Sequence, residues 1–221
     1  MRDMRSRQLL PAVLLLVSVT AALSQSSLFV VARDGTPADV RAALAAGANL
    51  EAHDEIGWTP LMIAAWSNDN PEVVQALLVA GANLEARNED GWTALMRAAA
   101  FNDNPEVIRV LLSAGANLEA RNPDEWTALM IAAGNSDNPE VVQALLVAGA
   151  NLEAHDEDGW TALMIAAAYN DNPEIVQALL DAGADAMARD SAGKRALDYA
   201  QDNAALRDSD AYQLLNDASF Q

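Results

Sequence analysis

Apolar and polar positions alternate in short blocks along most of the chain, and the whole pattern repeats every 34 residues. Proline and glycine return with this spacing, and so does tryptophan, at Trp58, Trp92, Trp126 and Trp160. Self-similarity at a fixed period of this length is the sequence signature of a repeat solenoid, in which each period forms one supersecondary unit. The pattern therefore predicts a row of stacked units.

The residues between two successive tryptophans predict a pair of short helices. In the second unit, residues 94–100 are good helix formers and follow Thr93, a suitable N-cap. Residues 104–106 (Asn-Pro-Glu) then begin another helix, because asparagine caps, proline suits the first helical position and glutamate faces the positive end of the helix dipole. Residues 107–112 continue this second helix, and Gly115 supplies the left-handed residue that closes it.

Neither helix of a unit is long enough to be stable alone. Isolated helices need about 12 to 15 residues to persist in water. Stability must therefore come from the stacking of each unit on its neighbours. We expect an all-α solenoid with short, hairpin-like loops between the units, and capping units with polar outer faces that keep the protein monomeric.

The residues of one unit resemble an ankyrin repeat from end to end. The resemblance is carried by Gly-Trp-Thr-Pro-Leu-Met-Ile-Ala-Ala at 57–65 and by Glu-Val-Val-Gln-Ala-Leu-Leu-Val-Ala-Gly-Ala-Asn-Leu at 72–84, and the pattern recurs four times. It implies a non-catalytic protein-binding module with four full repeats between two capping repeats. The implied units are 25–57 (N-terminal cap), 58–91, 92–125, 126–159, 160–193 and 194–221 (C-terminal cap).

Two features depart from the ankyrin pattern. The family's usual period is about 33 residues, and the additional residue lies in the turn between the two helices. The histidine of the family's Thr-Pro-Leu-His is replaced by methionine, at Met62, Met96, Met130 and Met164. The resemblance implies that apolar packing, for which methionine is well suited, replaces a histidine–threonine hydrogen bond.

Residues 1–24 have the features of a secretory signal peptide. Three arginines precede an uncharged, largely apolar run at 9–23, and small residues follow. The run is interrupted by Pro11 and would span about 22 Å as a helix, less than the roughly 30 Å of a bilayer core. We expect cleavage near Ala22 to Ser24 and export to a periplasm or the medium. The alternative is an uncleaved anchor that holds the repeats at a membrane, outside the cytoplasm.

The charge of the chain limits the classes of partner. It carries 32 acidic and 13 basic residues, for a formal net charge of −19. Such a surface repels nucleic acid and anionic lipid headgroups and attracts basic proteins. Cysteine is absent, which removes disulfides and thiolate chemistry. A basic protein is the expected partner, and nucleic acid is not.

The sequence predicts no catalytic, cofactor or metal site. Its two histidines, His53 and His155, fall three units apart, about 30 Å at roughly 10 Å per layer. The turn aspartates recur once per unit instead of converging as calcium requires, and helix capping explains them together with their flanking asparagines: Asp69, Asp103, Asp137 and Asp171. The alternative is a metal-dependent enzyme in the acidic loops, which metal analysis of the purified protein tests.

The resemblance implies that partner contacts come from the loop tips and the exposed side of each first helix, which together form a concave face. In this sequence those positions combine carboxylates with large aromatic rings, and such rings anchor protein interfaces while carboxylates steer a basic partner. The predicted binding residues are Glu55, Trp58, Trp66, Glu89, Asp90, Trp92, Arg97, Phe101, Asp124, Trp126, Asn135, Glu157, Asp158, Trp160 and Tyr169.

Two interpretations of the four repeated tryptophans stay open. They are anchors of an interface, or they are products of repeat duplication that pack against the neighbouring loop. Arg97 and Arg109 mark the second unit as a local exception to the acidic surface. Tailoring of the surface is indicated where the units differ at nearly equivalent positions, namely Trp66, Phe101, Asn135 and Tyr169.

Overall fold

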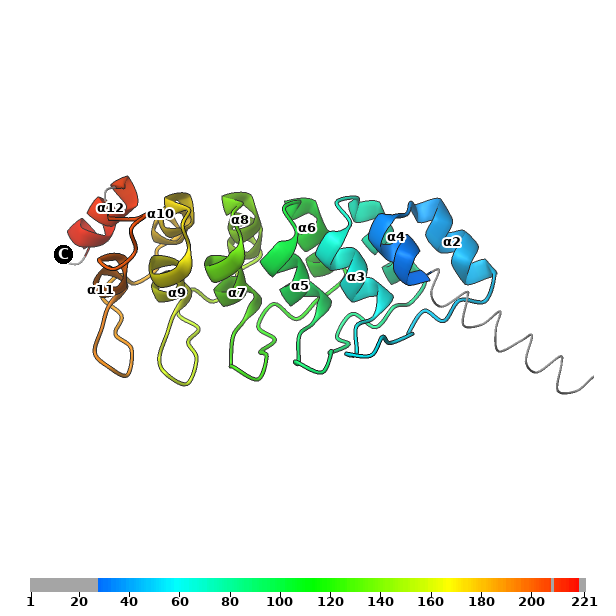
Figure 1. The fold of residues 1–221 in the computed structure, drawn as a ribbon. Coiled ribbons are helices and arrows are strands. Elements are labelled where there is room, and N and C mark those ends of the chain that lie inside the picture. The colour runs from blue at the N-terminus through cyan, green and yellow to red at the C-terminus, as the bar shows by residue number, and fades with distance from the viewer. Residues whose placement is uncertain (1–27, 208, 219–221) are drawn as a thin grey trace, which may run out of the picture.

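Pairs of helices stack in a row in the computed structural model, which describes residues 28–207 and 209–218 (Figure 1). Residues 28–34 are helical and precede the first complete helix. The complete helices are α2 (Pro37–Ala45), α3 (Pro60–Ser67), α4 (Pro71–Val79), α5 (Ala94–Phe101), α6 (Pro105–Ser113), α7 (Ala128–Asn135), α8 (Pro139–Val147), α9 (Ala162–Tyr169), α10 (Pro173–Asp181), α11 (Ala196–Ala200) and α12 (Asp210–Ala218). The all-α solenoid expected from the 34-residue period is confirmed.

The helices form two rows. We call α3, α5, α7, α9 and α11 the inner helices, and α2, α4, α6, α8, α10 and α12 the outer helices. Inner helices contact inner helices of the neighbouring units, and outer helices contact outer helices. The long loops all project from the inner-helix side of the row (Figure 1).

The helices begin at the predicted capping residues. Thr93 Oγ1 accepts a hydrogen bond from the backbone nitrogen of Met96 at 3.4 Å, and Asn104 Oδ1 accepts one from the backbone nitrogen of Glu106 at 3.0 Å. Helix α6 therefore starts at the proline after Asn104, as predicted. Gly115 follows this helix with a φ of 94°, as its predicted closing role requires.

Asparagine alone supplies the side-chain caps of α4, α6, α8 and α10. The preceding aspartate contributes its backbone oxygen instead. Asp103 O, for example, accepts from Asn138 Nδ2 of the next unit at 2.7 Å. Capping thus explains the asparagines, but it is wrong for the aspartates, and the backbone oxygens of Asp69, Asp103 and Asp137 accept from the next unit instead.

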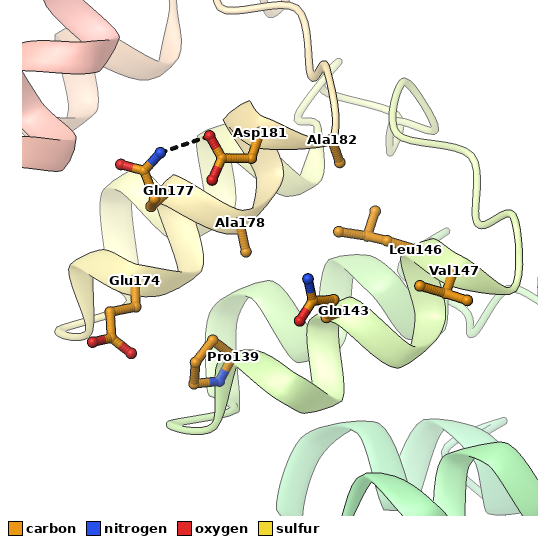
Figure 2. Close-up of a pocket in the computed structure, with 9 residues that line it drawn as sticks. All are labelled: Pro139, Gln143, Leu146, Val147, Glu174, Gln177, Ala178, Asp181 and Ala182. Carbon is orange, nitrogen blue, oxygen red and sulfur yellow. Dashed lines mark hydrogen bonds between the residues drawn. The ribbon is translucent and has the colours of Figure 1, made fainter.

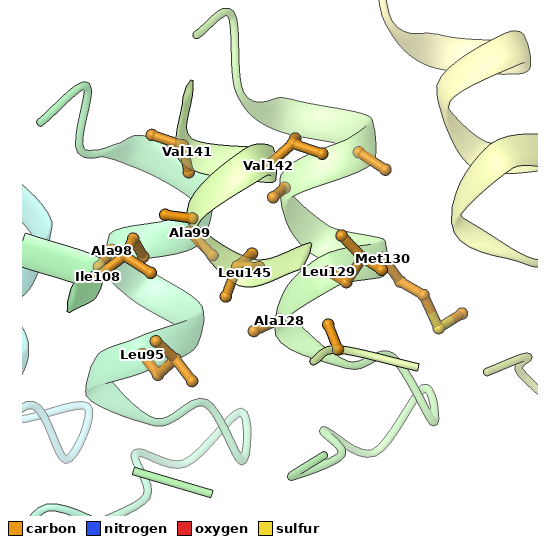
Figure 3. Packing of buried hydrophobic residues seen from close by; sticks show 14 of the residues in the cluster. Leu95, Ala98, Ala99, Ile108, Ala128, Leu129, Met130, Val141, Val142 and Leu145 are labelled. Carbon is orange, nitrogen blue, oxygen red and sulfur yellow. The ribbon is translucent and has the colours of Figure 1, made fainter. Parts of the chain in front are cut away.

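Small side chains on the inner helices and branched ones on the outer helices fill the space between the units (Figure 3). Ala98 and Ala99 of α5 are buried and allow close approach of the inner helices, while Val141 and Leu145 of α8 are buried against them. All four methionines that stand in place of the family's histidine are also buried, at Met62, Met96, Met130 and Met164.

Buried asparagines that follow the inner helices connect each unit to the one before it. Asn170 Nδ2 donates to the backbone oxygens of Ala133 and Ser136, at 3.0 and 2.9 Å. Ser136 holds this position in the third unit and hydrogen-bonds within its own turn instead. The equivalent inter-unit bonds come from Asn68, Asn102 and Asn203.

None of the helices formed by the described residues is both long and apolar enough to cross a membrane. The predicted signal segment, residues 1–24, lies outside the described residues.

Candidate binding surface

An aspartate or asparagine side chain holds each loop in a tight turn. Asn88 Oδ1 accepts from the backbone nitrogen of Trp92 at 2.8 Å, and Asn122 does the same for Trp126. Such a side chain mimics a backbone turn and directs the residues inside it toward solvent. We call these turns the first to fifth loop tips: residues 54–58, 88–92, 122–126, 156–160 and 190–194.

The four repeated tryptophans are largely structural. Trp58 is only 8 % exposed, and Trp92, Trp126 and Trp160 are partly buried against the core. This arrangement favours the packing interpretation, since each indole covers apolar side chains next to the inner helices. The prediction that Trp58 is an exposed anchor is therefore wrong.

Exposed ring surface comes instead from the residues that differ between units. Trp66 packs edge-on against Trp58, with ring centroids 5.1 Å apart, and is 38 % exposed. Phe101 stacks on Trp92 at 6.3 Å and is 51 % exposed, and Tyr169 stacks on Trp160 at 5.7 Å and is 63 % exposed. In each pair the tryptophan supports a second ring that faces solvent.

Arg97 is not an exposed positive charge. Its guanidinium lies 4.1 Å from the ring centroid of Trp58 and 4.5 Å from that of Trp92, and the residue is 9 % exposed. Burial lowers its pKa, while Asp90, whose carboxylate is 3.7 Å away, acts in the opposite direction. Arg109 lies on the outer helix α6 and pairs with Glu106. Each of the two arginines thus lies beside a carboxylate, and Arg97 is buried, so they do not make the second unit the expected exception to the acidic surface.

The predicted acidic residues all lie exposed at the loop tips, on the side of the row from which the loops project. Asn135 is also exposed, at the end of α7, where Phe101 and Tyr169 end their own helices. The structure thus places two kinds of side chain on one side of the molecule: exposed aromatic rings and the carboxylates of Glu55, Glu89, Asp90, Asp124, Glu157 and Asp158.

The two histidines occupy positions that arginine fills in other units, where it ties adjacent loops together. Arg87 Nη1 donates to Gly91 O at 2.9 Å and to Arg121 O of the next loop at 2.7 Å. His53 and His155 make only contacts within their own loops. Among the described residues, no group of three or more His, Asp or Glu side chains is arranged to hold a metal ion. The recurring Arg/His position was visible in the sequence, but the bond to the next loop was not.

A tyrosine at the C-terminal end extends the ring contacts. The ring centroid of Tyr199, in α11, lies 4.2 Å from that of Trp160 and 5.0 Å from the Lys194 ammonium nitrogen. The Tyr199 hydroxyl donates a hydrogen bond to the Asp190 carboxylate. Burial and the hydrogen bond to Asp190 raise the pKa of Tyr199. This cluster fixes the fifth loop tip on the fourth unit.

Glu125 occupies a backbone conformation that suits glycine. Its φ is 63°, and the equivalent residues of the other tips are all glycine, with φ between 72° and 82°: Gly57, Gly91, Gly159 and Gly193. Left-handed backbone costs a residue with a Cβ roughly 1–2 kcal/mol. The third tip is therefore the strained one.

Replacing Glu125 by glycine is expected to raise the free energy of unfolding by about 0.5 to 1 kcal/mol, because relief of strain exceeds the entropy that glycine adds to the unfolded chain. The substitution also removes the ion pair between Arg121 and Glu125 at 3.4 Å, which is exposed and contributes little to stability. Urea unfolding measures the change. Glu125→Ala keeps the Cβ and is the control; an equal gain in that variant would show that strain is not the cause.

Two apolar grooves lie between outer helices, away from the loop tips. One, about 450 Å³ in volume, is lined by α8 and α10, with Leu146, Val147 and Ala178 among its walls (Figure 2). Gln177 Nε2 donates to Asp181 Oδ1 beside it at 2.7 Å. The other lies between α2 and α4 and includes Val79. Neither groove contains any of the predicted binding residues.

Comparison with protein families gives one match. The sequence matches a family model described as ankyrin repeats (3 copies), in three overlapping segments at residues 7–88, 63–153 and 129–219. Together these segments run through every helix pair described above. The sequence has no significant match among curated proteins.

Proposed function

The chain belongs to the ankyrin repeat family, and on that premise we propose that it is an exported, non-catalytic module that binds a protein partner carrying positive charge. The proposed surface is the concave face formed by the loop tips and the inner helices. One observation carries the proposal: Trp66, Phe101 and Tyr169 are exposed on the same side as the tip carboxylates.

The exposed rings supply the attraction that is independent of charge. A large ring held in place by a second ring loses little conformational entropy on binding, and rings of this kind are frequent hot spots in protein interfaces. Phe101 and Tyr169 are each held in this way, by Trp92 and Trp160. In this proposal Trp92 and Trp160 support the anchors, and the residues that differ between units at the helix ends set specificity.

The carboxylates supply steering and select the sign of the partner. Exposed charges of one sign raise the rate of encounter with an oppositely charged protein, and this effect decreases over about 8 Å at physiological ionic strength. With a net charge of −19 the chain attracts basic proteins and repels acidic ones. We therefore expect the affinity for the partner to fall as salt is added.

The groups with displaced pKa values among the described residues have structural roles, which supports a non-catalytic module. Asp39 has a lowered pKa because it accepts hydrogen bonds from Thr36 at the start of α2. Arg97 lies between two indoles, and Asp190 and Tyr199 hydrogen-bond to each other. None of these is a pair of acid and base facing a common space.

Export is proposed on the sequence of residues 1–24 alone. Sequencing the N-terminus of the protein from its source cells tests it. A mature start near Gln25, in protein outside the cytoplasm, supports export with cleavage. A start at Met1 in the membrane fraction supports the alternative, a scaffold anchored by the uncleaved segment, and a start at Met1 in the cytoplasm contradicts both.

Truncation of the supported rings tests the binding surface. The partner is first captured from the native compartment and identified, and its affinity is then measured by calorimetry. Phe101→Ala with Tyr169→Ala is expected to weaken binding by about tenfold or more, since hot-spot rings are the residues whose loss costs most.

The matched control is Val79→Ala with Val147→Ala, which removes exposed apolar groups from the outer helices. It should leave the affinity unchanged. Equal weakening by both double variants, or an affinity that does not respond to salt, contradicts the proposed surface.

A further inference from the structure

Backbone hydrogen bonds join neighbouring loop tips at both ends of the row, and none is found between the tips at its centre among the described residues. Glu89 N donates to Ile56 O at 3.2 Å, and Ser191 N donates to Asp158 O at 2.8 Å. Pro123 has no N–H to offer the second tip, and within the described residues no backbone bond joins the third tip to the fourth. A cleft of about 350 Å³ opens there, lined by Pro123, Asp124, Trp126, Asp156, Glu157 and Asp158.

The cleft carries negative charge, and no ion pair within residues 28–207 and 209–218 involves its carboxylates. Asp156 is engaged, because it accepts from the Trp126 indole nitrogen at 3.1 Å and from backbone nitrogens of its own tip. Asp124, Glu157 and Asp158 are exposed. Arg121 lines an adjoining hollow with Asp156 and Glu157, but its guanidinium donates to the backbone oxygens of Glu125 and His155.

The molecule contains a second copy of this arrangement in which a cation is bound. Between the first and second tips, Asp90 lies 3.7 Å from the Arg97 guanidinium, which lies 4.1 Å from the ring centroid of Trp58. Asp158 and Trp126 are the equivalents of Asp90 and Trp58, two periods later. The residue at the position of Arg97 is Ile165, which is fully buried in the core. The same aspartate and tryptophan thus recur without their cation.

Trp126 also differs from the other three repeated tryptophans in its ring contacts. Trp58, Trp92 and Trp160 each contact another aromatic ring. Trp126 has neither a ring nor a cation against it among the described residues, because Asn135 stands where Phe101 and Tyr169 stand in their units. The Trp126 ring therefore lacks both the aromatic contact and the cation contact that the equivalent tryptophans make.

We infer that this cleft receives one arginine or lysine side chain from the protein partner. The carboxylates of Asp124, Glu157 and Asp158 attract the charge, and Trp126 provides the apolar wall, as Trp58 does for Arg97. The source of the side chain rests on the proposed function; the preference for a cation rests on the cleft itself.

The test uses the whole protein. The probe is N-acetyl-arginine amide, and N-acetyl-citrulline amide is its neutral isostere. In ¹H–¹⁵N spectra at low salt, the arginine probe is expected to shift the Trp126 indole resonance and the Glu157 and Asp158 amides saturably, with millimolar affinity. The Trp58 indole should not respond, because Arg97 already occupies the equivalent position beside it. An equal response to citrulline, or no saturable response at Trp126, overturns the inference.

Paired substitutions locate the effect. Asp124→Asn with Glu157→Gln is expected to weaken the arginine probe about tenfold. Glu55→Gln with Glu89→Gln removes the same charge from the first and second tips and should change the affinity less than twofold. Equal weakening by both pairs would show only general electrostatic attraction and would overturn the assigned site.

The two proposals fail separately. If the arginine probe binds saturably but no protein partner is found whose affinity depends on Phe101 and Tyr169, the cation cleft is retained and the proposed function is rejected. If a partner's affinity depends on Phe101 and Tyr169 but is unaffected by Asp124→Asn with Glu157→Gln, the proposed function is retained and the cleft is rejected as a cation site.

Discussion

Replacing Asn170 by alanine is expected to lower the free energy of unfolding by about 2 to 3 kcal/mol. The amide donates to Ala133 O and Ser136 O of the preceding unit and accepts from the backbone nitrogen of Asn172. The residue is buried, so the backbone groups that it serves lose their partners without gaining water, and each buried polar group left unpaired costs about 1–3 kcal/mol. Urea unfolding followed by circular dichroism measures the loss.

The third unit offers the reciprocal control. Ser136 occupies the asparagine position there, so Ser136→Asn supplies the missing inter-unit donor to the second unit and is expected to stabilise the protein by about 1 kcal/mol. If Asn170→Ala lowers the free energy of unfolding but Ser136→Asn does not raise it, the contribution of Asn170 comes from its own turn and not from the bonds to the preceding unit. No loss in Asn170→Ala would contradict the role given to the buried asparagines.

Leu145→Ala is expected to destabilise the protein by about 3 to 4 kcal/mol. Leu145 is fully buried in α8 and packs among the side chains of the third unit's core (Figure 3). Truncation removes transfer free energy and leaves a cavity that the surrounding helices fill only in part, which is why buried leucine truncations are costly. Since a solenoid is coupled only between nearest neighbours, the same change should also broaden the unfolding transition.

Val147→Ala is the matched control, because it removes two methyl groups from the same helix at an exposed position. It should change stability by no more than about 0.5 kcal/mol. Similar losses from the two substitutions would contradict the division between a buried inner side and an exposed outer side of α8.

Helix positions were predictable from the sequence because their signals are local. Thr93 and Asn104 cap the helices that follow them through bonds spanning two or three residues, and the 34-residue spacing transfers the same prediction to every unit. The interior role of Met96 was predictable for the same reason. The match to the ankyrin repeat family confirms the resemblance that these residues carry.

Interactions between units were predictable only in part. The recurrence of asparagine at positions 68, 102 and 170, with Ser136 between them, was present in the sequence as a signal. A one-dimensional pattern does not show that an asparagine donates to a carbonyl group 34 or 37 residues earlier. Capping of the nearest helix explains the same spacing equally well.

The exposure of the candidate site depends on which side chains meet across units. The sequence predicts Arg97 as a surface charge, but two indoles from different loops enclose it. It leaves open whether Trp58 is an interface anchor or a packed ring, and in the structure Trp66 and Arg97 cover that ring. The exposed rings at Phe101 and Tyr169 were predictable, because residues that differ between otherwise duplicated units lie where packing does not constrain them.

The direction of the asparagine bonds affects how the protein is completed during its synthesis. Each amide belongs to the later unit, and the two carbonyl groups that it serves belong to the earlier one. A ribosome delivers about 5–20 residues per second, so a unit of 34 residues waits about 2 to 7 seconds for its successor. The most recently folded unit of a growing chain therefore has backbone carbonyl groups that still lack their asparagine donor. Asn203 serves the fourth unit in the same way, because it donates to the backbone oxygens of Ala167 and Asn170.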